Sequence, residues 1–284
     1  MATVKRIISI QSHVLHGHVG NAAAVPAMTA LGCKVTAVPT TLLSNHPHYP
    51  TMRGQILDTN LVADLLTGIE ERGLVEDAAM LVTGYLGSAE NGLTVADFVD
   101  RAKARNPDLL IVCDPVLGDE DLGLFTDPLL IEVYRERLMP QSWLVTPNRW
   151  EAQLLVSADP RGELELLQQL RLTGATNVVV TGGTIQPRPL RTIGLDGGGC
   201  WAIETPWLPA RAAGTGDYFT GALAGAIMSG ESIRAAAERA VTMTHRLLAR
   251  TSALPWSELP IDDYPAAIEA DPRFRAVSLF QAAS

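Results

Sequence analysis

Short apolar runs alternate along the chain with longer segments whose apolar residues recur at helical spacing. Residues 79–83 and 109–113 are continuous apolar runs, which are typical of strands buried on both faces of a parallel sheet. Between them, residues 95–104 have the spacing of a helix. By the same criteria we predict further strands at 4–10, 34–40, 143–145 and 177–181, and further helices at 20–31, 61–72, 129–138, 164–172 and from Thr215 and Ser232.

This alternation of strands and helices predicts an α/β fold with a central, mostly parallel β-sheet flanked by helices on both faces. Residues 191–195 and 199–204 flank Asp196-Gly197-Gly198 and are expected to form a hairpin on an Asp-Gly turn. The sequence has no linker, low-complexity tract or internal repeat, so residues 1–284 are read as a single domain. The last 30 residues carry four prolines and are expected to wrap the surface.

Composition and charge narrow the classes of partner. The net charge of −9 and the lack of a long basic run argue against nucleic-acid binding. The three cysteines lack C-x-x-C spacing, which argues against a zinc ribbon or a disulfide scaffold and suits a reducing cytoplasm. The N-terminus lacks the apolar core of a signal peptide, and no apolar stretch is long enough to span a membrane. We therefore expect a cytoplasmic protein without a membrane partner.

The segment Gly214-Thr215-Gly216-Asp217 is the most informative motif. It precedes the small-residue run 221–226, which predicts a helix packed closely against something flat. Unpaired amides at a helix N-terminus suit an anion, and a carboxylate beside that anion is a candidate base for an incoming hydroxyl. The motif thus indicates phosphoryl transfer to an alcohol, with a glycine-rich turn capped by Asp217 as the alternative.

Polar clusters follow the predicted strands at the edge where ligands bind in parallel sheets. They comprise residues 11–13, 84–87, 114–119, 146–148 with Glu151, and 182–183. Within them, Asp114, Asp119 and Glu151 are candidate Mg²⁺ ligands, because Mg²⁺ prefers oxygen. The alternative for each carboxylate taken alone is a solvated surface turn.

Other site types are weaker. The chain has no G-x-x-x-x-G-K-[ST] loop, and Phe219 stands where a dinucleotide fingerprint would require glycine, so neither a P-loop NTPase nor a Rossmann dehydrogenase is supported. Five of the six histidines (His13, His16, His18, His46 and His48) fall within the first 48 residues. Their spacing leaves a zinc site open. It favours a polar pocket for an aromatic heterocycle, with imidazoles as hydrogen-bond partners.

Together these segments resemble the pyridoxal kinases of the ribokinase-like superfamily over nearly the whole chain. The resemblance implies a ribokinase-like fold, ATP as co-substrate, Mg²⁺, stimulation by a monovalent cation such as K⁺, and a homodimer. The Gln-Ser-His and Ser-Asn-His segments are the specific ones, whereas Gly-Thr-Gly-Asp is shared across the superfamily. The segments that carry the resemblance are 10–14, 17–21, 44–46, 83–85, 112–119, 146–148 with Glu151, and 214–217.

Matching positions imply roles. Asp217 would be the catalytic base, and Gly214, Thr215 and Gly216 would form the anion hole. Ser12 would bond the pyridine ring of the substrate. The remaining implied positions are Val19, His46, Pro47, His48 and Tyr85 for the substrate, and Asp114, Thr146, Asn148, Glu151, Thr181, Gly183, Gly214 and Gly216 for ATP, with Asp114, Asp119 and Glu151 toward Mg²⁺.

One departure concerns the substrate side. The family commonly continues Ser-Asn-His with a threonine whose hydroxyl helps to hold the substrate, and Pro47 stands there instead, followed by His48. The preferred vitamer is therefore left open. The expected reaction is ATP-dependent phosphorylation of the 5′-hydroxymethyl group of pyridoxal, with pyridoxine and pyridoxamine as further substrates. The alternatives are a hydroxymethylpyrimidine or sugar kinase of the same fold and a non-catalytic pyridoxal phosphate carrier.

Overall fold

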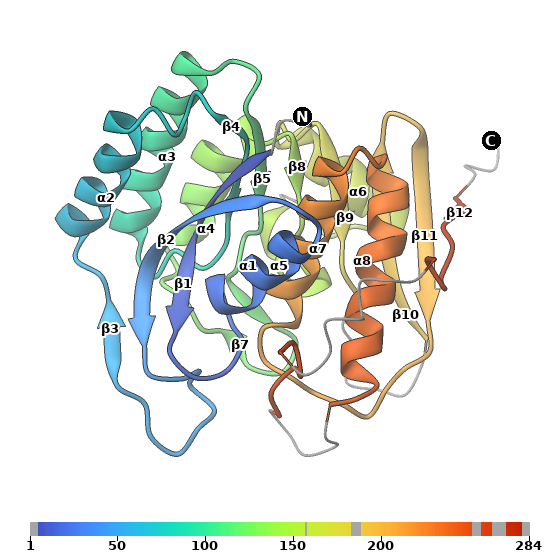
Figure 1. Cartoon of the computed structure of the whole chain (residues 1–284). Coiled ribbons are helices and arrows are strands. Elements are labelled where there is room, and N and C mark those ends of the chain that lie inside the picture. Colours follow the sequence, from blue (N-terminus) through green and yellow to red (C-terminus); the bar gives the residue numbers. More distant parts are fainter. Residues whose placement is uncertain (1–4, 157, 183–188, 252–256, 263–270, 280–284) are drawn as a thin grey trace.

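The fold is organised around one ten-stranded sheet, shown in the computed structural model of Figure 1, which describes residues 5–156, 158–182, 189–251, 257–262 and 271–279. The strand order is β12-β11-β10-β9-β8-β5-β4-β1-β2-β3. The bounds are β1 (Arg6–Val14), β2 (Lys34–Leu43), β3 (Gly54–Ile56), β4 (Ala78–Thr83), β5 (Leu110–Cys113), β8 (Leu144–Val145), β9 (Asn177–Val180), β10 (Leu190–Asp196), β11 (Gly199–Thr205) and β12 (Val277–Ser278).

The six neighbouring strands β9, β8, β5, β4, β1 and β2 are parallel to one another. At the edges of the sheet, β3 pairs antiparallel with β2, and β10, β11 and β12 each pair antiparallel with the preceding strand. The predicted hairpin is confirmed, since Asp196 of β10 pairs with Gly199 of β11. A separate small hairpin, β6 (Gly118–Asp119) and β7 (Gly123–Leu124), lies outside the large sheet. The mostly parallel central sheet predicted from the apolar runs is therefore confirmed.

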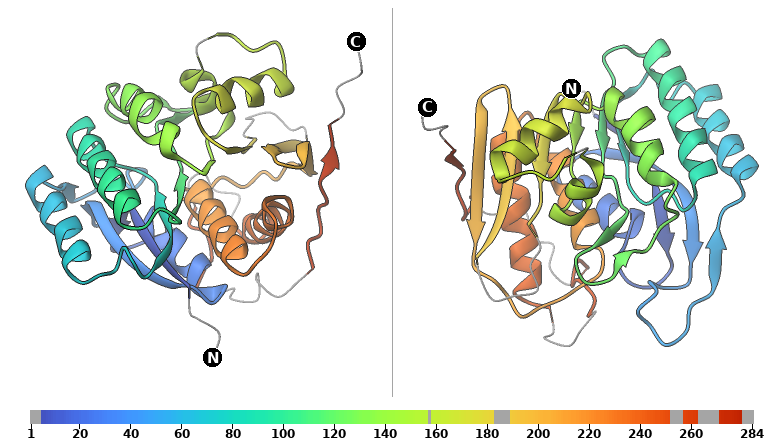
Figure 2. Two further views of the ribbon diagram at one scale, coloured as in Figure 1. Left: turned by 90° about the horizontal axis from the view of Figure 1, so that it is seen from above. Right: turned by 180° about the vertical axis from the view of Figure 1, so that it is seen from behind.

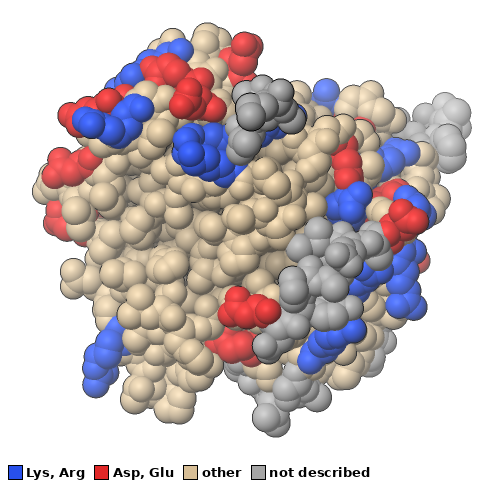
Figure 3. Space-filling model, viewed as in Figure 1, with Lys and Arg blue, Asp and Glu red and all other residues tan. Residues whose placement is uncertain are grey.

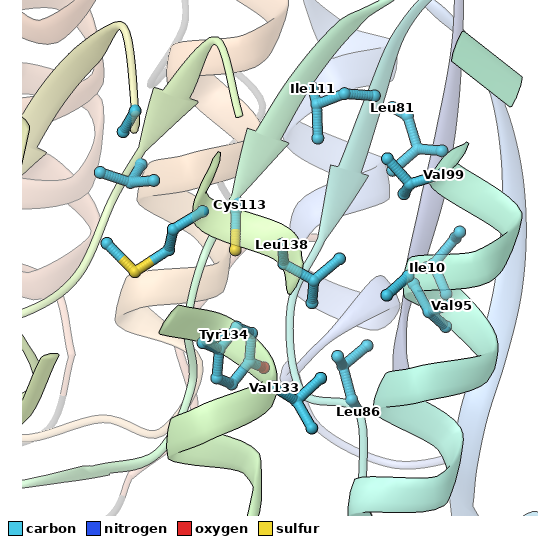
Figure 4. Packing of buried hydrophobic residues seen from close by; sticks show 14 of the residues in the cluster. Ile10, Leu81, Leu86, Val95, Val99, Ile111, Cys113, Val133, Tyr134 and Leu138 are labelled. Carbon is cyan, nitrogen blue, oxygen red and sulfur yellow. The ribbon is translucent and has the colours of Figure 1, made fainter. Parts of the chain in front are cut away.

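Helices cover both faces of the sheet, as Figures 1 and 2 show. One face carries α2 (Thr59–Glu71), α3 (Ala89–Arg105), α4 (Leu130–Val133), α5 (Arg149–Leu155) and α6 (Glu163–Leu172), and the other carries α1 (Asn21–Ala30), α7 (Thr215–Met228) and α8 (Ile233–Leu248). Alternate strand residues serve the two layers, because successive side chains point to opposite faces. Ile8 packs in the first layer together with Ile10, which Figure 4 shows, whereas Ile7 packs in the second.

The small-residue run of α7 brings two helices into close contact. A side chain at Gly221 would overlap the backbone of Ala24 in α1, and one at Gly225 would meet Leu31. The predicted close packing is confirmed, but the neighbour across these glycines is helix α1, so the expectation of a flat partner there was wrong. This packing sets the position of the N-terminus of α7.

Several element boundaries differ from the prediction. Helix α3 begins at Ala89, earlier than residue 95, because the Ser88 hydroxyl caps it by accepting from Asn91 N. The predicted helix 129–138 is only four residues of α4 followed by a π-helical turn, Tyr134–Leu138, and a 3₁₀ turn, Met139–Gln141. Helix α5 was missed, since its polar N-terminus was interpreted only as a ligand site.

The first strand is also longer than predicted. It continues to Val14, so Ser12 lies within β1 and does not follow it. The register with β2 shifts between Gln11 and His13, which is the irregularity expected where a strand re-aims a side chain beside a site. Half of the last 30 residues, which were expected to wrap the surface, lie outside the described residues; of the rest, Val277–Ser278 form the edge strand β12.

Charged side chains on the face shown in Figure 3 are mixed in sign. Over α2 and α3, basic and acidic groups pair, as in Arg101 with Glu70 at 3.0 Å and Arg105 with Glu76 at 2.6 Å. Exposed pairs of this kind contribute little to stability, about 0–1 kcal/mol each. Among the described residues, no helix is long and apolar enough to cross a membrane.

Candidate active site

A cavity of ≈ 680 Å³ lies beyond the carboxyl ends of the parallel strands. Its position agrees with the expectation for ligand sites in parallel sheets. The structure brings together there every predicted site residue that it describes, and Gly183 lies outside the described residues. These residues are Ser12, Val19, His46, Pro47, His48, Tyr85, Asp114, Asp119, Thr146, Asn148, Glu151, Thr181, Gly214, Thr215, Gly216 and Asp217.

The glycine-rich loop forms the N-terminus of α7. Gly214 has φ 77°, a left-handed conformation that favours glycine, and any side chain there would overlap the carbonyl oxygen of His18. The first bond of the helix runs from Tyr218 N to the Gly214 carbonyl at 2.9 Å, so the amides of residues 215–217 precede it. The Thr215 hydroxyl donates to the Ala212 carbonyl at 2.9 Å and fixes the loop. Any anion contact from Thr215 therefore falls to its amide.

Asp217 lies in the first turn of α7 and faces the start of α1. Its Oδ2 accepts a hydrogen bond from Gly20 N at 2.8 Å. Gly20 has φ 56°, and a side chain there would overlap the Ser12 carbonyl and hydroxyl, so only glycine fits. Burial raises the pKa of Asp217, while the Gly20 amide opposes that shift. A raised pKa makes the carboxylate a stronger base than an exposed aspartate.

Asp114 follows β5 and is held by a residue of α7. The Thr220 hydroxyl donates to Asp114 Oδ2 at 2.9 Å and lies 3.1 Å from the Thr146 hydroxyl. Burial raises the pKa of Asp114 well above its usual range, and the charges of Glu151 and Asp217 add to the shift. A cluster of buried carboxylates with raised pKa values favours the arrival of a cation.

Glu151 accepts from three backbone amides of two loops. Its Oε1 accepts from Leu117 N at 3.0 Å and Gly118 N at 3.4 Å, and its Oε2 accepts from Asn148 N at 2.8 Å. Asn148 Oδ1 accepts from Glu151 N at 2.9 Å, which completes a capping box at the start of α5. Burial raises the pKa of Glu151 to about 7 despite these hydrogen bonds, and the charge of Asp217 contributes.

The three predicted Mg²⁺ ligands, Asp114, Asp119 and Glu151, all line the cavity. Within the described part of the chain, no group of three or more His, Cys, Asp or Glu side chains is placed to hold a metal ion by itself. One carboxylate oxygen of Asp119 orders its own turn, because Oδ1 accepts from Asp121 N at 2.9 Å and Leu122 N at 2.7 Å. The Mg²⁺ ligand set stays a prediction. Asp114 still fits Mg²⁺, which commonly takes one or two carboxylates together with substrate phosphates.

The same observation bears on the histidine-rich segment, whose described residues form no zinc cluster. His16 Nε2 lies 3.1 Å from the Tyr49 hydroxyl, and His18 Nε2 lies 3.2 Å from Asp262 Oδ2. Of these histidines, only His46 and His48 line the cavity. Their rings lie 5.5 Å apart between centroids, and Tyr85 and Pro47 line the same cavity.

The sequence is similar to a known protein family and to characterised kinases. The family model described as phosphomethylpyrimidine kinase matches residues 17–262. A pyridoxal kinase of Leifsonia xyli is 37% identical over 254 residues, which cover 87% of this chain and 89% of the relative. One of Arabidopsis thaliana is 35% identical over 273 residues, or 92% and 84% of the two chains. The chain belongs to the pyridoxal kinase family.

A solved structure supports the same assignment. The pyridoxal kinase of Leishmania donovani, in complex with ADP and pyridoxamine, matches with a TM-score of 0.86 at 28% identity. The match covers 96% of this chain and 98% of that one. The resemblance drawn from the sequence motifs and the ribokinase-like fold it implied are confirmed, and the chain is a kinase of this family.

Several residues of this pyridoxal kinase family site were missed by sequence reasoning. Thr220 holds Asp114, and it could have been found because a residue three positions after Asp217 lies on the same helix face. Gly20 binds Asp217 through its backbone amide, which no side-chain pattern announces. Leu122 and Phe125, beside the β6–β7 hairpin, also line the cavity.

The carboxylate cluster predicts a pH dependence of stability in the ligand-free protein. The folded-state pKa of Glu151 is raised from 4.5 to about 7, so its contribution is fully present below about pH 4.5 and is lost as pH rises through 7. We expect the free energy of unfolding to fall between pH 5 and pH 8, measured by denaturant titration. Glu151→Gln should be less stable at pH 6, because it loses backbone contacts, but its stability should vary less with pH. An equally steep decline in both proteins would contradict the assignment.

Proposed function

We propose that the protein transfers the γ-phosphoryl group of ATP to the 5′-hydroxyl of pyridoxal. The observation that carries the proposal is the position of Asp217, which lies in the first turn of α7 and lines the same cavity as His46 and Tyr85. A base, an anion site and a pocket for an aromatic ring thus share one space. The pyridoxamine and ADP bound by the Leishmania donovani relative support a B6 vitamer and an adenine nucleotide as ligands.

In the proposed reaction, the oxygen of the alcohol attacks the γ-phosphorus, and Asp217 accepts the proton that this oxygen loses. The bond from that phosphorus to the β–γ bridging oxygen breaks, and ADP leaves with the electron pair. The amides of residues 215–217 lie where they stabilise charge on the transferring oxygens. When bound, Mg²⁺ would neutralise the phosphates, with Asp114 as the residue of this chain that fits it.

Further properties stay predictions, namely stimulation by K⁺, a location in the cytoplasm and a homodimer. For the dimer, apolar side chains exposed around the β2–β3 edge offer a surface for a second copy, with Leu15 76%, Leu42 41% and Ile56 42% exposed. Sedimentation of the purified protein decides between monomer and dimer.

A second substrate deserves a test, because the matching family model is described as phosphomethylpyrimidine kinase. A hydroxymethylpyrimidine would present the same kind of primary alcohol on a flat heterocycle. Hydroxymethylpyrimidine kinases usually carry Ser-Gly-Gly near the first strand, where this chain has Ser12-His13-Val14, and this favours pyridoxal. A non-catalytic carrier is disfavoured by the intact Asp217 and its anion loop.

The deciding experiment incubates the protein with Mg²⁺-ATP and each candidate alcohol and detects the phosphorylated product by mass. The set comprises pyridoxal, pyridoxine, pyridoxamine and hydroxymethylpyrimidine. We expect the largest kcat/KM with a B6 vitamer. Phosphorylation of hydroxymethylpyrimidine alone would overturn the proposal in favour of the second substrate, and ADP formation with none of them would leave neither standing.

Pro47 predicts weaker substrate binding than a threonine would give. A neutral hydrogen bond contributes about 0.5–1.5 kcal/mol, so Pro47→Thr should lower the KM for pyridoxal by about 2- to 13-fold. His48 lines the cavity beside it, and burial lowers its pKa, with the charge of Arg211 contributing. If His48 replaces the missing hydroxyl, His48→Ala should raise the KM for pyridoxal more than that for ATP. An unchanged KM would make His48 a solvated loop residue.

A further inference from the structure

Glu258 lies far from the catalytic motif in sequence and reaches two loops of the substrate side. Its Oε2 accepts a hydrogen bond from His18 N at 3.0 Å, and its Oε1 accepts one from the Tyr49 hydroxyl at 3.0 Å. His46 Nε2 lies 2.9 Å from the same Oε1. Through these contacts, one carboxylate connects the C-terminal segment 257–262 to the loop after β1 and to the loop after β2. The Glu258 side chain is partly buried, with 24% of it exposed.

The contact with His46 fixes the state of a ring that lines the cavity. His46 is 1% exposed, and its Nδ1 accepts a hydrogen bond from His48 N at 3.3 Å. An accepting nitrogen carries no proton, so the ring proton sits on Nε2, the nitrogen that lies 2.9 Å from the Glu258 carboxylate. Because both nitrogens face partners within the protein, the ring offers the substrate a flat surface in a fixed orientation.

The second loop links Glu258 to the catalytic base through the backbone. A side chain at Gly17 would overlap the Glu258 carboxylate, which shows how closely the loop approaches it. The next residue, His18, places its carbonyl oxygen against the Cα of Gly214. Two residues further, Gly20 N donates to Asp217. The loop held by Glu258 is therefore the one that positions both the anion loop and the base.

The Glu258 carboxylate stays ionised, and so keeps its hydrogen bonds, from neutral pH down to strongly acidic pH. Burial alone would raise the pKa of Glu258, but the contacts with His46, Tyr49 and the His18 amide outweigh it and lower the pKa to about 2. The stabilisation is present above the ordinary glutamate pKa of 4.5 and is lost only as pH falls toward 2. Asp262, behind the His18 ring, is the other carboxylate facing this cluster.

We propose that Glu258 is a positioning residue that fixes His46 and the loop 17–20 in place on the vitamer side of the cavity. The inference rests on the proposed phosphorylation of pyridoxal. It assigns the C-terminal segment a part in substrate binding that its distance in sequence from the motif would not suggest.

The test compares Glu258→Gln with the wild type in the full-length protein. The glutamine side chain keeps one acceptor oxygen but places an NH₂ group where Glu258 now accepts a hydrogen bond. One of the two loops therefore loses its contact and moves. We expect the KM for pyridoxal to rise about tenfold and the KM for ATP to change less than about twofold. In ¹⁵N-detected histidine spectra, with His46→Asn used for assignment, the Nε2–H signature of His46 should be lost in Glu258→Gln.

Glu238→Gln is the matched control. Its carboxylate also holds the C-terminal part of the chain, by accepting from Ala276 N at 2.8 Å and Arg275 at 2.9 Å, but neither of these partners lines the cavity, whereas the Glu258 partner His46 does. It should lower the melting temperature without changing the ratio of the two KM values. Equal rises of both KM values in Glu258→Gln, or an unchanged His46 signature, would overturn the proposal. If the wild type does not phosphorylate pyridoxal, the proposed function fails, and the His46 signature alone then decides the role of Glu258.

Discussion

Asp217→Asn is expected to reduce the turnover of pyridoxal by about 10²- to 10⁴-fold, the usual contribution of a general base. The asparagine retains an oxygen that can accept from Gly20 N, so the start of α1 should stay in place. It also removes one charge from the cluster that raises the pKa values of Asp114 and Glu151. We therefore expect unchanged or higher thermal stability, an unchanged KM for ATP and a loss confined to kcat, measured by initial rates and thermal unfolding.

Asp127→Asn provides a matched control for this variant. Asp127 Oδ2 also accepts from a backbone amide at a helix start, Ala89 N at 3.0 Å, but it lies outside the cavity. It should keep nearly the full turnover. If Asp217→Asn retains more than about a tenth of the wild-type kcat, Asp217 is not the base.

Much of the fold could be predicted because its signals are local. A strand buried on both faces is a continuous apolar run, as at 109–113, and the order of runs and helical segments is enough to predict a parallel sheet. Boundaries failed where one residue serves two purposes. Glu151 and Asn148 were interpreted as ligands, yet together they cap α5, so the helix behind them was not recognised.

The sequence could predict which residues belong to the site, but not the hydrogen bonds between them. Each predicted cluster ends a strand, which explains why the residues meet in one cavity. The contacts that order them are made by backbone atoms or across large sequence separations. Gly20 N reaches Asp217 across 197 positions and His18 N reaches Glu258 across 240 positions, and neither pairing leaves a periodic pattern in the sequence. The turn contacts of Asp119 are a related case, because its Oδ1 accepts from backbone amides two and three residues later, which the sequence motif did not indicate.

The anion loop gives the second large effect, through Gly214→Ala. Alanine at φ 77° would be strained by about 1–2 kcal/mol, and its Cβ would overlap the carbonyl oxygen of His18. Relief of that overlap requires the loop 17–20 and the start of α7 to separate, which displaces the amides of residues 215–217 from the transferring phosphoryl group. The loss of one such donor typically lowers kcat about 10²- to 10³-fold, and we expect at least the lower figure here.

Gly230→Ala separates backbone strain from damage to the site. Gly230 follows the C-terminus of α7 with φ 101°, but nothing lies within 4 Å of a side chain placed there, and it does not line the cavity. Both variants should therefore lose stability in denaturant titrations, Gly214→Ala the more because of its overlap with His18, while only Gly214→Ala loses kcat. Similar kcat values in the two variants would show that the Gly214 amide turn does not contribute to phosphoryl transfer. A selective loss of kcat would place the catalytic requirement in the contact between the His18 carbonyl and the first turn of α7.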